Sequence, residues 1–233
     1  MKRNFLLILC LLFFHNSFCQ NTIWHEVRID SFLTVSLPGN IVIIDTSITQ
    51  NGKISPAKVF TVTASSSTIV LTVGQGGRSV NPYKPDSDLK KAREEFKKGF
   101  RESIESNGYS VDIKDTVVND VHGFKGDVFA DESKTSLSII CYSFCVNSLS
   151  YSFMVAPSNS NVVERNENVD KLVRSIRFNK ENILLNTGNN ELSINYQKLG
   201  ELTGILLIAG VIIFAVYRNN KRKNQAGNKK NEL

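Results

Sequence analysis

The stretch that decides the fold reads Ile140-Cys141-Tyr142-Ser143-Phe144-Cys145-Val146-Asn147-Ser148-Leu149-Ser150-Tyr151-Ser152-Phe153-Met154-Val155. A two-residue loop at Asn147-Ser148 would make this stretch a β-hairpin and would place opposing residues on common faces. One face would carry the large side chains, namely Ile140, Tyr142, Phe144, Val146, Leu149, Tyr151, Phe153 and Val155. The other would carry Cys145 with Ser150, Ser143 with Ser152, and Cys141 with Met154. A shift of one residue would mix the two sets, so the pattern predicts this register.

Further strands are predicted on the N-terminal side of the hairpin. Runs of apolar and β-branched residues bounded by turn residues cover 31–37, 41–48, 58–64 and 68–73. Two more runs, at 109–118 and 124–130, flank the turn-like residues 119–123. Residues 74–85 contain three Gly and two Pro and predict a loop. We therefore expect an antiparallel sheet built from consecutive strands.

Two helices are predicted beside these strands. The first begins at Asp86 or Ser87, ends at Asn107-Gly108, and has an apolar stripe at helical spacing: Leu89, Ala92, Phe96, Phe100 and Ser103. Its other face, which includes Arg93 and Lys97, mixes charges of both signs and is expected to face solvent. The second helix runs from Val162 to about Arg174, with a stripe of Val162, Val169, Leu172 and Val173, and leads into a short strand at 175–178.

The first 19 residues have the layout of a secretory signal peptide. Lys2 and Arg3 precede an apolar run of about ten residues, which is shorter than the ~20 that a membrane-spanning helix needs. We expect residues 1–19 to be a signal peptide that is cleaved after Cys19. Retention of this segment as an anchor is the main alternative, and acylation of Cys19 is a further one.

A second apolar stretch lies near the C-terminus. Leu202 to Val216 is uncharged, and with its flanks the stretch 199–217 would be ~28 Å long as a helix. A basic cluster at 218–223 follows it, as is typical of a cytoplasmic flank. We expect residues 199–217 to be a transmembrane helix and 218–233 to be a basic cytoplasmic tail, with a buried core helix as the alternative. Gly200-x-x-x-Gly204 matches the small-residue pattern of helix dimers, but at the outer edge of the span.

The two ends divide the chain into an exported α+β domain at 20–180, a polar Asn-rich stalk at 181–198, the span and the tail. The net charge of +6 arises at the ends, because residues 20–217 carry 20 basic and 21 acidic side chains. Nucleic-acid binding is therefore not expected. None of the 24 Asn residues begins an Asn-x-Ser/Thr acceptor, which favours a bacterial envelope with the domain in the periplasm.

The order of these elements allows a comparison with known folds. The chain starts with four predicted strands, the first of which ends in Val35-Ser36-Leu37-Pro38, and continues with a central helix, a meander and a last helix that closes on Ser175-Ile176-Arg177-Phe178. This order resembles the PsbP-like and DcrB-like α/β/α sandwich superfamily over residues 28–179. The resemblance implies an antiparallel sheet with helices on its faces, and relatives that mostly bind or assist assembly without catalysis. Such domains often have an aromatic residue where Asn40 and Ile41 stand, so no functional residue is carried over.

No catalytic or metal site is predicted. His25 and His122 are the only histidines beyond the signal segment, and neither lies in a recognisable motif. The glycines at 74, 76 and 77 lack the Lys-Ser/Thr ending of a phosphate loop. Cys141 and Cys145, four residues apart on one strand, have Cα atoms ~13 Å apart and are expected to be free thiols.

We therefore expect a non-catalytic exported domain, held at the membrane by one span, that binds a protein or another envelope component without a cofactor. A small-ligand or lipid binding domain is the alternative. An envelope enzyme is a third possibility, and it would need His25 or His122 beside a carboxylate or a serine.

Overall fold

The computed structural model describes residues 23–50, 53–64, 66–83, 87–130, 137–157, 162–185 and 196–205. The predicted signal peptide, residues 186–195 of the predicted stalk, residues 206–217 of the predicted span and the basic tail lie outside the described residues.

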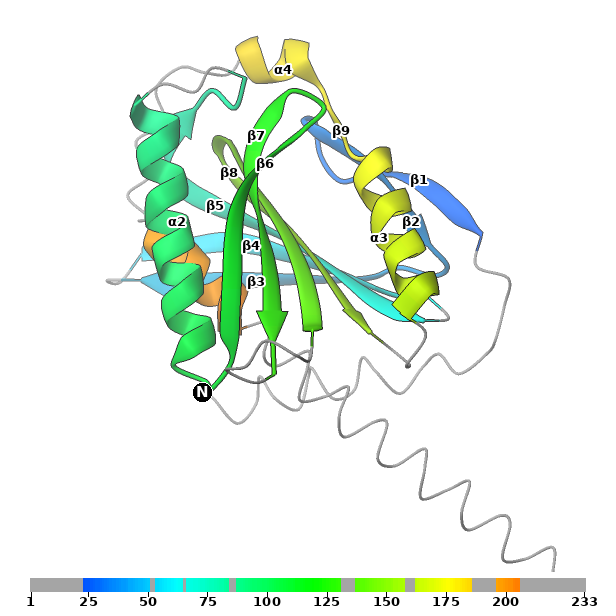
Figure 1. The fold of residues 1–233 in the computed structure, drawn as a ribbon. Coiled ribbons are helices and arrows are strands. Elements are labelled where there is room, and N and C mark those ends of the chain that lie inside the picture. The colour runs from blue at the N-terminus through cyan, green and yellow to red at the C-terminus, as the bar shows by residue number, and fades with distance from the viewer. Residues whose placement is uncertain are drawn as a thin grey trace, which may run out of the picture.

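The largest element is a six-stranded antiparallel sheet with the order β3-β4-β5-β8-β7-β6 (Figure 1). Its strands are β3 (Val42–Gln50), β4 (Lys53–Thr63), β5 (Ser67–Val80), β6 (Ser110–Val118), β7 (Val121–Phe129) and β8 (Leu137–Pro157). Most neighbours in the sheet are joined by short turns. At one of these turns Asn119 and Asp120 have φ angles of 48° and 65°, which side chains of this type tolerate.

Strand β8 folds back on itself and forms the predicted hairpin. The hydroxyl oxygens of Ser143 and Ser152 are 2.9 Å apart, whereas nine residues of a straight strand would separate them by ~30 Å. The arm before Asn147 pairs with β7, and the arm after it pairs with β5. Asn147 has a φ of 52°, as the first residue of a two-residue hairpin loop requires. The predicted loop and register are therefore confirmed.

The two faces of the hairpin enter two different cores, as the sorting of large and small side chains predicts. The large residues all lie in the core that includes β2 and α3: Ile140, Tyr142, Phe144, Val146, Leu149, Tyr151, Phe153 and Val155. Cys141, Cys145 and Met154 lie in the core on the opposite face. A second layer of chain covers the aromatic face.

That layer combines a small sheet with a helix. Strands β1 (Trp24–Arg28), β2 (Leu33–Pro38) and β9 (Arg177–Phe178) pair antiparallel in the order β1-β2-β9. Helix α3 (Val162–Ser175) lies against β2 and β8, and its Val169 and Leu172 are buried as predicted. The short helix α4 (Lys180–Leu185) follows β9.

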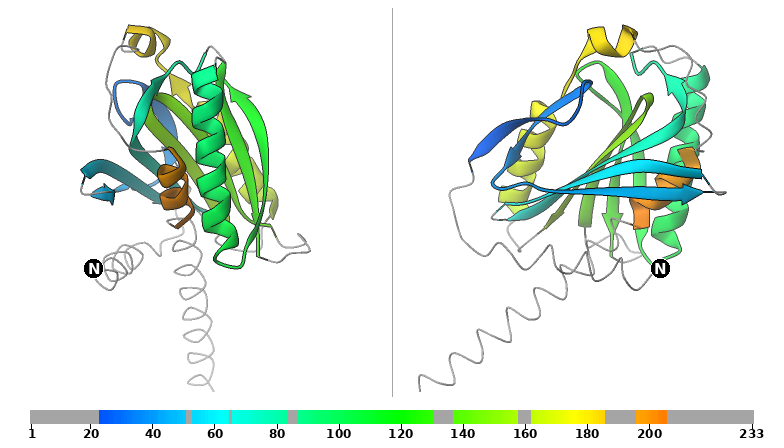
Figure 2. Two further views of the ribbon diagram at one scale, coloured as in Figure 1. Left: turned by 90° about the vertical axis from the view of Figure 1, so that its left-hand side faces the viewer. Right: turned by 180° about the vertical axis from the view of Figure 1, so that it is seen from behind.

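Helix α2 (Ser87–Glu105) covers the other face of the large sheet (Figures 1 and 2). The predicted stripe is buried in full, and the rings of Phe96 and Phe100 lie 5.6 and 5.8 Å from the ring of Phe124 on β7. Gly108, with a φ of 81°, takes the left-handed exit that follows the helix. A further helical segment, residues 196–205, lies beside α2 in both views of Figure 2.

The protein is thus an α+β fold in which antiparallel sheets are packed by helices. It differs from a plain α/β/α sandwich because β1, β2 and β9 share one face of the large sheet with α3. Strand β1 lies outside the predicted strands, and residues 74–80 are predicted as a loop. They belong to β5 instead, because β5 follows the hairpin past a register shift between Gln75 and Val80, and Val80 pairs with Asn147.

Within the described part of the chain, no helix combines the length and the apolar character needed to cross a bilayer. Of the predicted span, residues 199–205 are described, and they belong to the segment that lies beside α2.

Candidate functional site on helix α2

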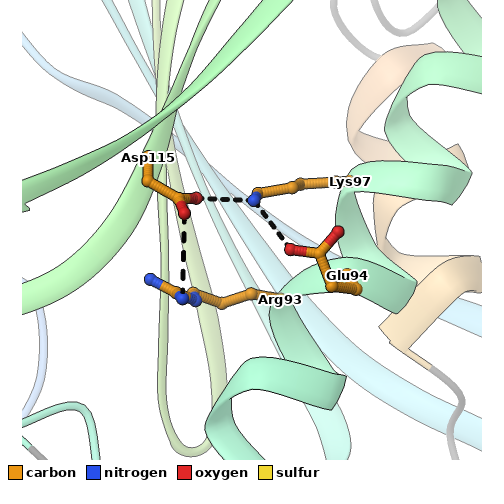
Figure 3. A network of polar contacts seen from close by, with 4 residues as sticks. All are labelled: Arg93, Glu94, Lys97 and Asp115. Carbon is orange, nitrogen blue, oxygen red and sulfur yellow. Dashed lines mark hydrogen bonds and ion pairs between the residues drawn. The ribbon is translucent and has the colours of Figure 1, made fainter. Parts of the chain in front are cut away.

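Helix α2 carries a polar network on the side that faces β6 (Figure 3). Lys97 Nζ lies 2.5 Å from Asp115 Oδ1 and 2.9 Å from Glu94 Oε1, and Arg93 Nη2 lies 4.0 Å from Asp115 Oδ2. The hydrogen bond from Lys97 is the main cause that lowers the pKa of Asp115. Asp115 therefore stays charged at neutral pH and is a poor proton acceptor. The arrangement joins α2 to β6 and does not place a general base.

Two members of this network are more buried than the sequence predicts. Arg93 is only 8% exposed and the Lys97 side chain only 15%, although both were assigned to a solvated face. Arg93 stands four residues after Leu89 and three before Phe96, so it lies within the buried stripe of the helix. Its aliphatic stem packs inward while its guanidinium group reaches toward Asp115 at the edge of the sheet.

The second feature of α2 is its close contact with residues 196–205. A Cβ atom added at Gly99 would overlap the backbone carbonyl of Gln197, and one added at Gly200 would overlap the carbonyl of Phe96. The two helix backbones therefore approach as closely as small residues allow. Neither position accepts even an alanine without a shift of backbone.

Residues 196–205, the docked segment, pack on the domain through their buried face. The residues buried along it follow helical spacing: Tyr196, Leu199, Gly200, Thr203 and Gly204. Tyr196 and Leu199 belong to the same core as the α2 stripe. The Tyr196 hydroxyl donates to the carbonyl of Asn147 in the hairpin loop at 3.2 Å, and Gln197 Nε2 donates to Glu102 Oε2 at 2.9 Å.

These contacts bear on two expectations from the sequence. Of the stretch assigned to a polar stalk, Glu181–Leu185 lie in α4 and residues 196–198 begin the docked helix. Residues 199–205 are predicted as the outer end of the span, but in the structure they pack on α2. Packing of this kind is what the alternative prediction, a buried core helix, implies for these seven residues. The Gly200-x-x-x-Gly204 pattern does bring a helix close to another, but the partner in the structure is α2 of the same chain.

The structure does not bring the two candidate histidines together. His25 lies on β1 opposite Leu37, and His122 lies on β7 opposite Val117, so they belong to different sheets. Among the described side chains, no group of three or more His, Cys, Asp and Glu is arranged to hold a metal ion. The glycine-rich residues 74–77 lie within β5 and not in a loop before a helix.

Cys141 and Cys145 are free thiols buried between the sheet and α2, as predicted. Burial raises the pKa of each thiol to about 12. Both thiols are therefore protonated at neutral pH and poor nucleophiles, which fits a packing role on the small-residue face.

The docked helix is not predicted from the sequence, because a polar Asn-rich stretch comes just before it. The spacing of Tyr196, Leu199, Gly200, Thr203 and Gly204 was present as a signal, but the apolar residues that follow favoured an interpretation as lipid-facing helix. No protein-family model, no curated protein and no solved structure matches this chain. The resemblance to PsbP-like and DcrB-like domains stays a prediction.

Proposed function

We propose that this chain is a single-pass membrane protein whose exported, non-catalytic domain binds a protein or another envelope component. In this proposal the signal peptide directs residues 20–198 across the membrane. Residues 199–217 form the anchor, and residues 218–233, which begin with the basic cluster, stay in the cytoplasm.

One observation carries the proposal: the apolar C-terminal stretch starts within a helix that is packed into the domain. Leu199 belongs to the core of the α2 face, and Tyr196 is bonded to the hairpin loop. A span that continues from this helix would hold the folded domain close to the membrane surface. Such placement suits a domain that meets its partner in or beside the membrane.

The absence of catalysis is part of the proposal and has its own support. His25 and His122 lie on separate sheets, and the Asp115 carboxylate is paired with Lys97 and Arg93. The volume between α2 and the sheet is occupied by the rings of Phe96, Phe100 and Phe124. This packing favours recognition by the outer surface over chemistry in an interior site.

Site-specific photo-crosslinking in native membranes tests the proposal. A photoreactive residue at Val163, which is 69% exposed on α3, is expected to capture a distinct envelope partner. The same residue at Leu172, buried on the same helix, is the matched control and is expected to capture nothing. A small molecule or lipid that co-purifies with the chain, without any crosslinked partner, would favour the ligand-binding alternative and contradict the proposal.

A further inference from the structure

We propose that residues 196–205 exchange between the docked position on α2 and the outer part of the bilayer, so that membrane insertion uncovers a groove on α2. The inference rests on the proposed function, because it takes residues 199–217 as the anchor. The α2 groove is defined here by Phe96, Gly99, Phe100 and Ser103. Its occupant is the chain's own segment 196–205, and the bilayer competes with the groove for that segment.

The groove and the segment fit closely. Gly99 forms the floor of the groove at the level of Gln197, and Gly200 lies against the backbone between Phe96 and Phe100. A Cβ atom added at Gly204 would stand 2.6 Å from the Cβ of Ser103, so this glycine fits the far end of the groove. The three glycines, Gly99 on α2 and Gly200 and Gly204 on the segment, thus make one continuous contact between the two helices. The segment therefore fits the groove specifically.

The apolar stretch is too short to span the bilayer while its first residues are docked on α2. Residues 199–217 number 19 and would extend ~28 Å as a helix, close to the ~30 Å of the bilayer core. If residues 199–205 stay on α2, the 12 residues 206–217 remain, and they would cover only ~18 Å. A single residue cannot lie on α2 and in lipid at the same time. Docking therefore shortens the span, and complete spanning requires release of the segment.

The segment has side chains suited to both environments. Leu199 and Leu202 contact the protein core when docked and would be equally acceptable in lipid, while Ile205 is already 51% exposed. Tyr196 would move from the hairpin loop to the interface region, where tyrosine is favoured. Lys198 and Glu201 form an ion pair at 2.5 Å on the helix itself, so neither charge depends on α2 for its partner.

Thiol crosslinking of the full chain in vesicles measures the exchange. Glu102→Cys combined with Gln197→Cys replaces a contacting pair across the groove. Phosphatidylcholine vesicles with short, medium and long monounsaturated acyl chains change the bilayer thickness, and a short bifunctional thiol reagent reports the docked state. The initial crosslinking rate is expected to fall from the thinnest to the thickest bilayer, by about tenfold overall, because a thick bilayer draws residues 199–205 into lipid.

Matched variants give the reference points. Glu102→Cys with Lys198→Cys is the control pair, because Lys198 points to Glu201 on its own helix, and it should crosslink slowly at every thickness. Gly200→Leu adds bulk that the groove cannot accept and lipid can, so it should abolish crosslinking even in thin bilayers. Ile205→Leu, on the exposed side, should behave as the parent chain. Continued protection of Cys141 and Cys145 from alkylation shows that each variant is folded.

The outcomes distinguish failure of the exchange from failure of the proposed membrane anchor. If the crosslinking rate is equally high in bilayers of every thickness, the segment never leaves α2. If no crosslinking occurs in any bilayer or in detergent, the segment does not occupy the groove in the full chain. Either result overturns the exchange, as would unchanged crosslinking in Gly200→Leu. Failure of the chain to sediment with any vesicle would instead contradict the proposed membrane anchor.

Discussion

Replacement of Tyr151 by phenylalanine removes one buried hydroxyl group and leaves the aromatic packing in place. The Tyr151 side chain is fully buried, and its ring lies 5.9 Å from the ring of Phe178. Its hydroxyl donates to Asp30 Oδ2 at 2.6 Å. The other oxygen of Asp30 accepts from the backbone N–H groups of Phe32 and Leu33 at 2.7 and 3.0 Å, so Asp30 fastens the β1–β2 turn to the centre of the large sheet.

The expected loss follows from the nature of this bond. A hydrogen bond to a charged group contributes about 1.5 to 3 kcal/mol, and Asp30 is only partly buried, so water replaces part of what the carboxylate loses. We expect Tyr151→Phe to lower the free energy of unfolding by about 2 kcal/mol. For a domain of this size that corresponds to a fall in melting temperature of about 4 to 8 °C.

Urea unfolding of the full chain in detergent, followed by the fluorescence of Trp24, measures this loss. Trp24 is the only tryptophan of the chain, and it is the first residue of β1, the strand that leads into the turn that Asp30 holds. Tyr142→Phe makes the same chemical change on the half-buried part of the same hairpin and should cost less than about 0.5 kcal/mol. Equal losses in the two variants would refute the assignment of Tyr151 and Asp30 as the fastening between the two sheets.

Two further predictions concern the hairpin. Phe144→Ala and Tyr151→Ala should couple by about 0.5 to 1.5 kcal/mol in a double-mutant cycle, because the two residues are cross-strand neighbours whose rings both contact Phe178; strict additivity would count against the register. The free energy of unfolding should fall as pH rises from 9 to 12, because the thiols of Cys141 and Cys145 ionise near 9 when exposed and near 12 when folded. Each thiol lowers the free energy of unfolding by up to about 1.4 kcal/mol per pH unit in this range. In urea titrations at pH 9 and 11, the Cys141→Ala/Cys145→Ala variant should therefore show a smaller fall in the free energy of unfolding than the parent chain. An unchanged fall would mean that the thiols are not buried.

The parts of the fold that could be predicted are those in which local pattern and packing agree. The sorting of large and small side chains around Asn147 allows only one register, and the structure has it. The apolar stripe of α2 predicts which face is buried, since no other face of that helix offers comparable apolar area. In both cases the residues that set the local structure are also the residues that fill the core.

The errors come from residues whose place depends on distant parts of the chain. The glycines after Val73 predict a loop, but β5 continues because the second arm of the hairpin supplies a pairing partner as far as Val80. Arg93 is predicted on the charged, solvent-facing side of α2. Its spacing instead puts it on the buried side, where its guanidinium group forms an ion pair with Asp115 on β6. Residues 196–198 are predicted as stalk and residues 199–205 as lipid-facing helix, because the sequence does not show that Gly99 on α2 lies opposite Gln197.

Reporter fusions test the central claim, a single span with an exported domain, most directly. A reporter that is active only in the cytoplasm should be active when fused at Leu233, and a reporter that is active only after export should be inactive there. The export-dependent reporter should be active when fused after Asn190, which precedes the docked helix and the span. Export-dependent activity at Leu233 would place the basic tail outside the cytoplasm and would contradict the account.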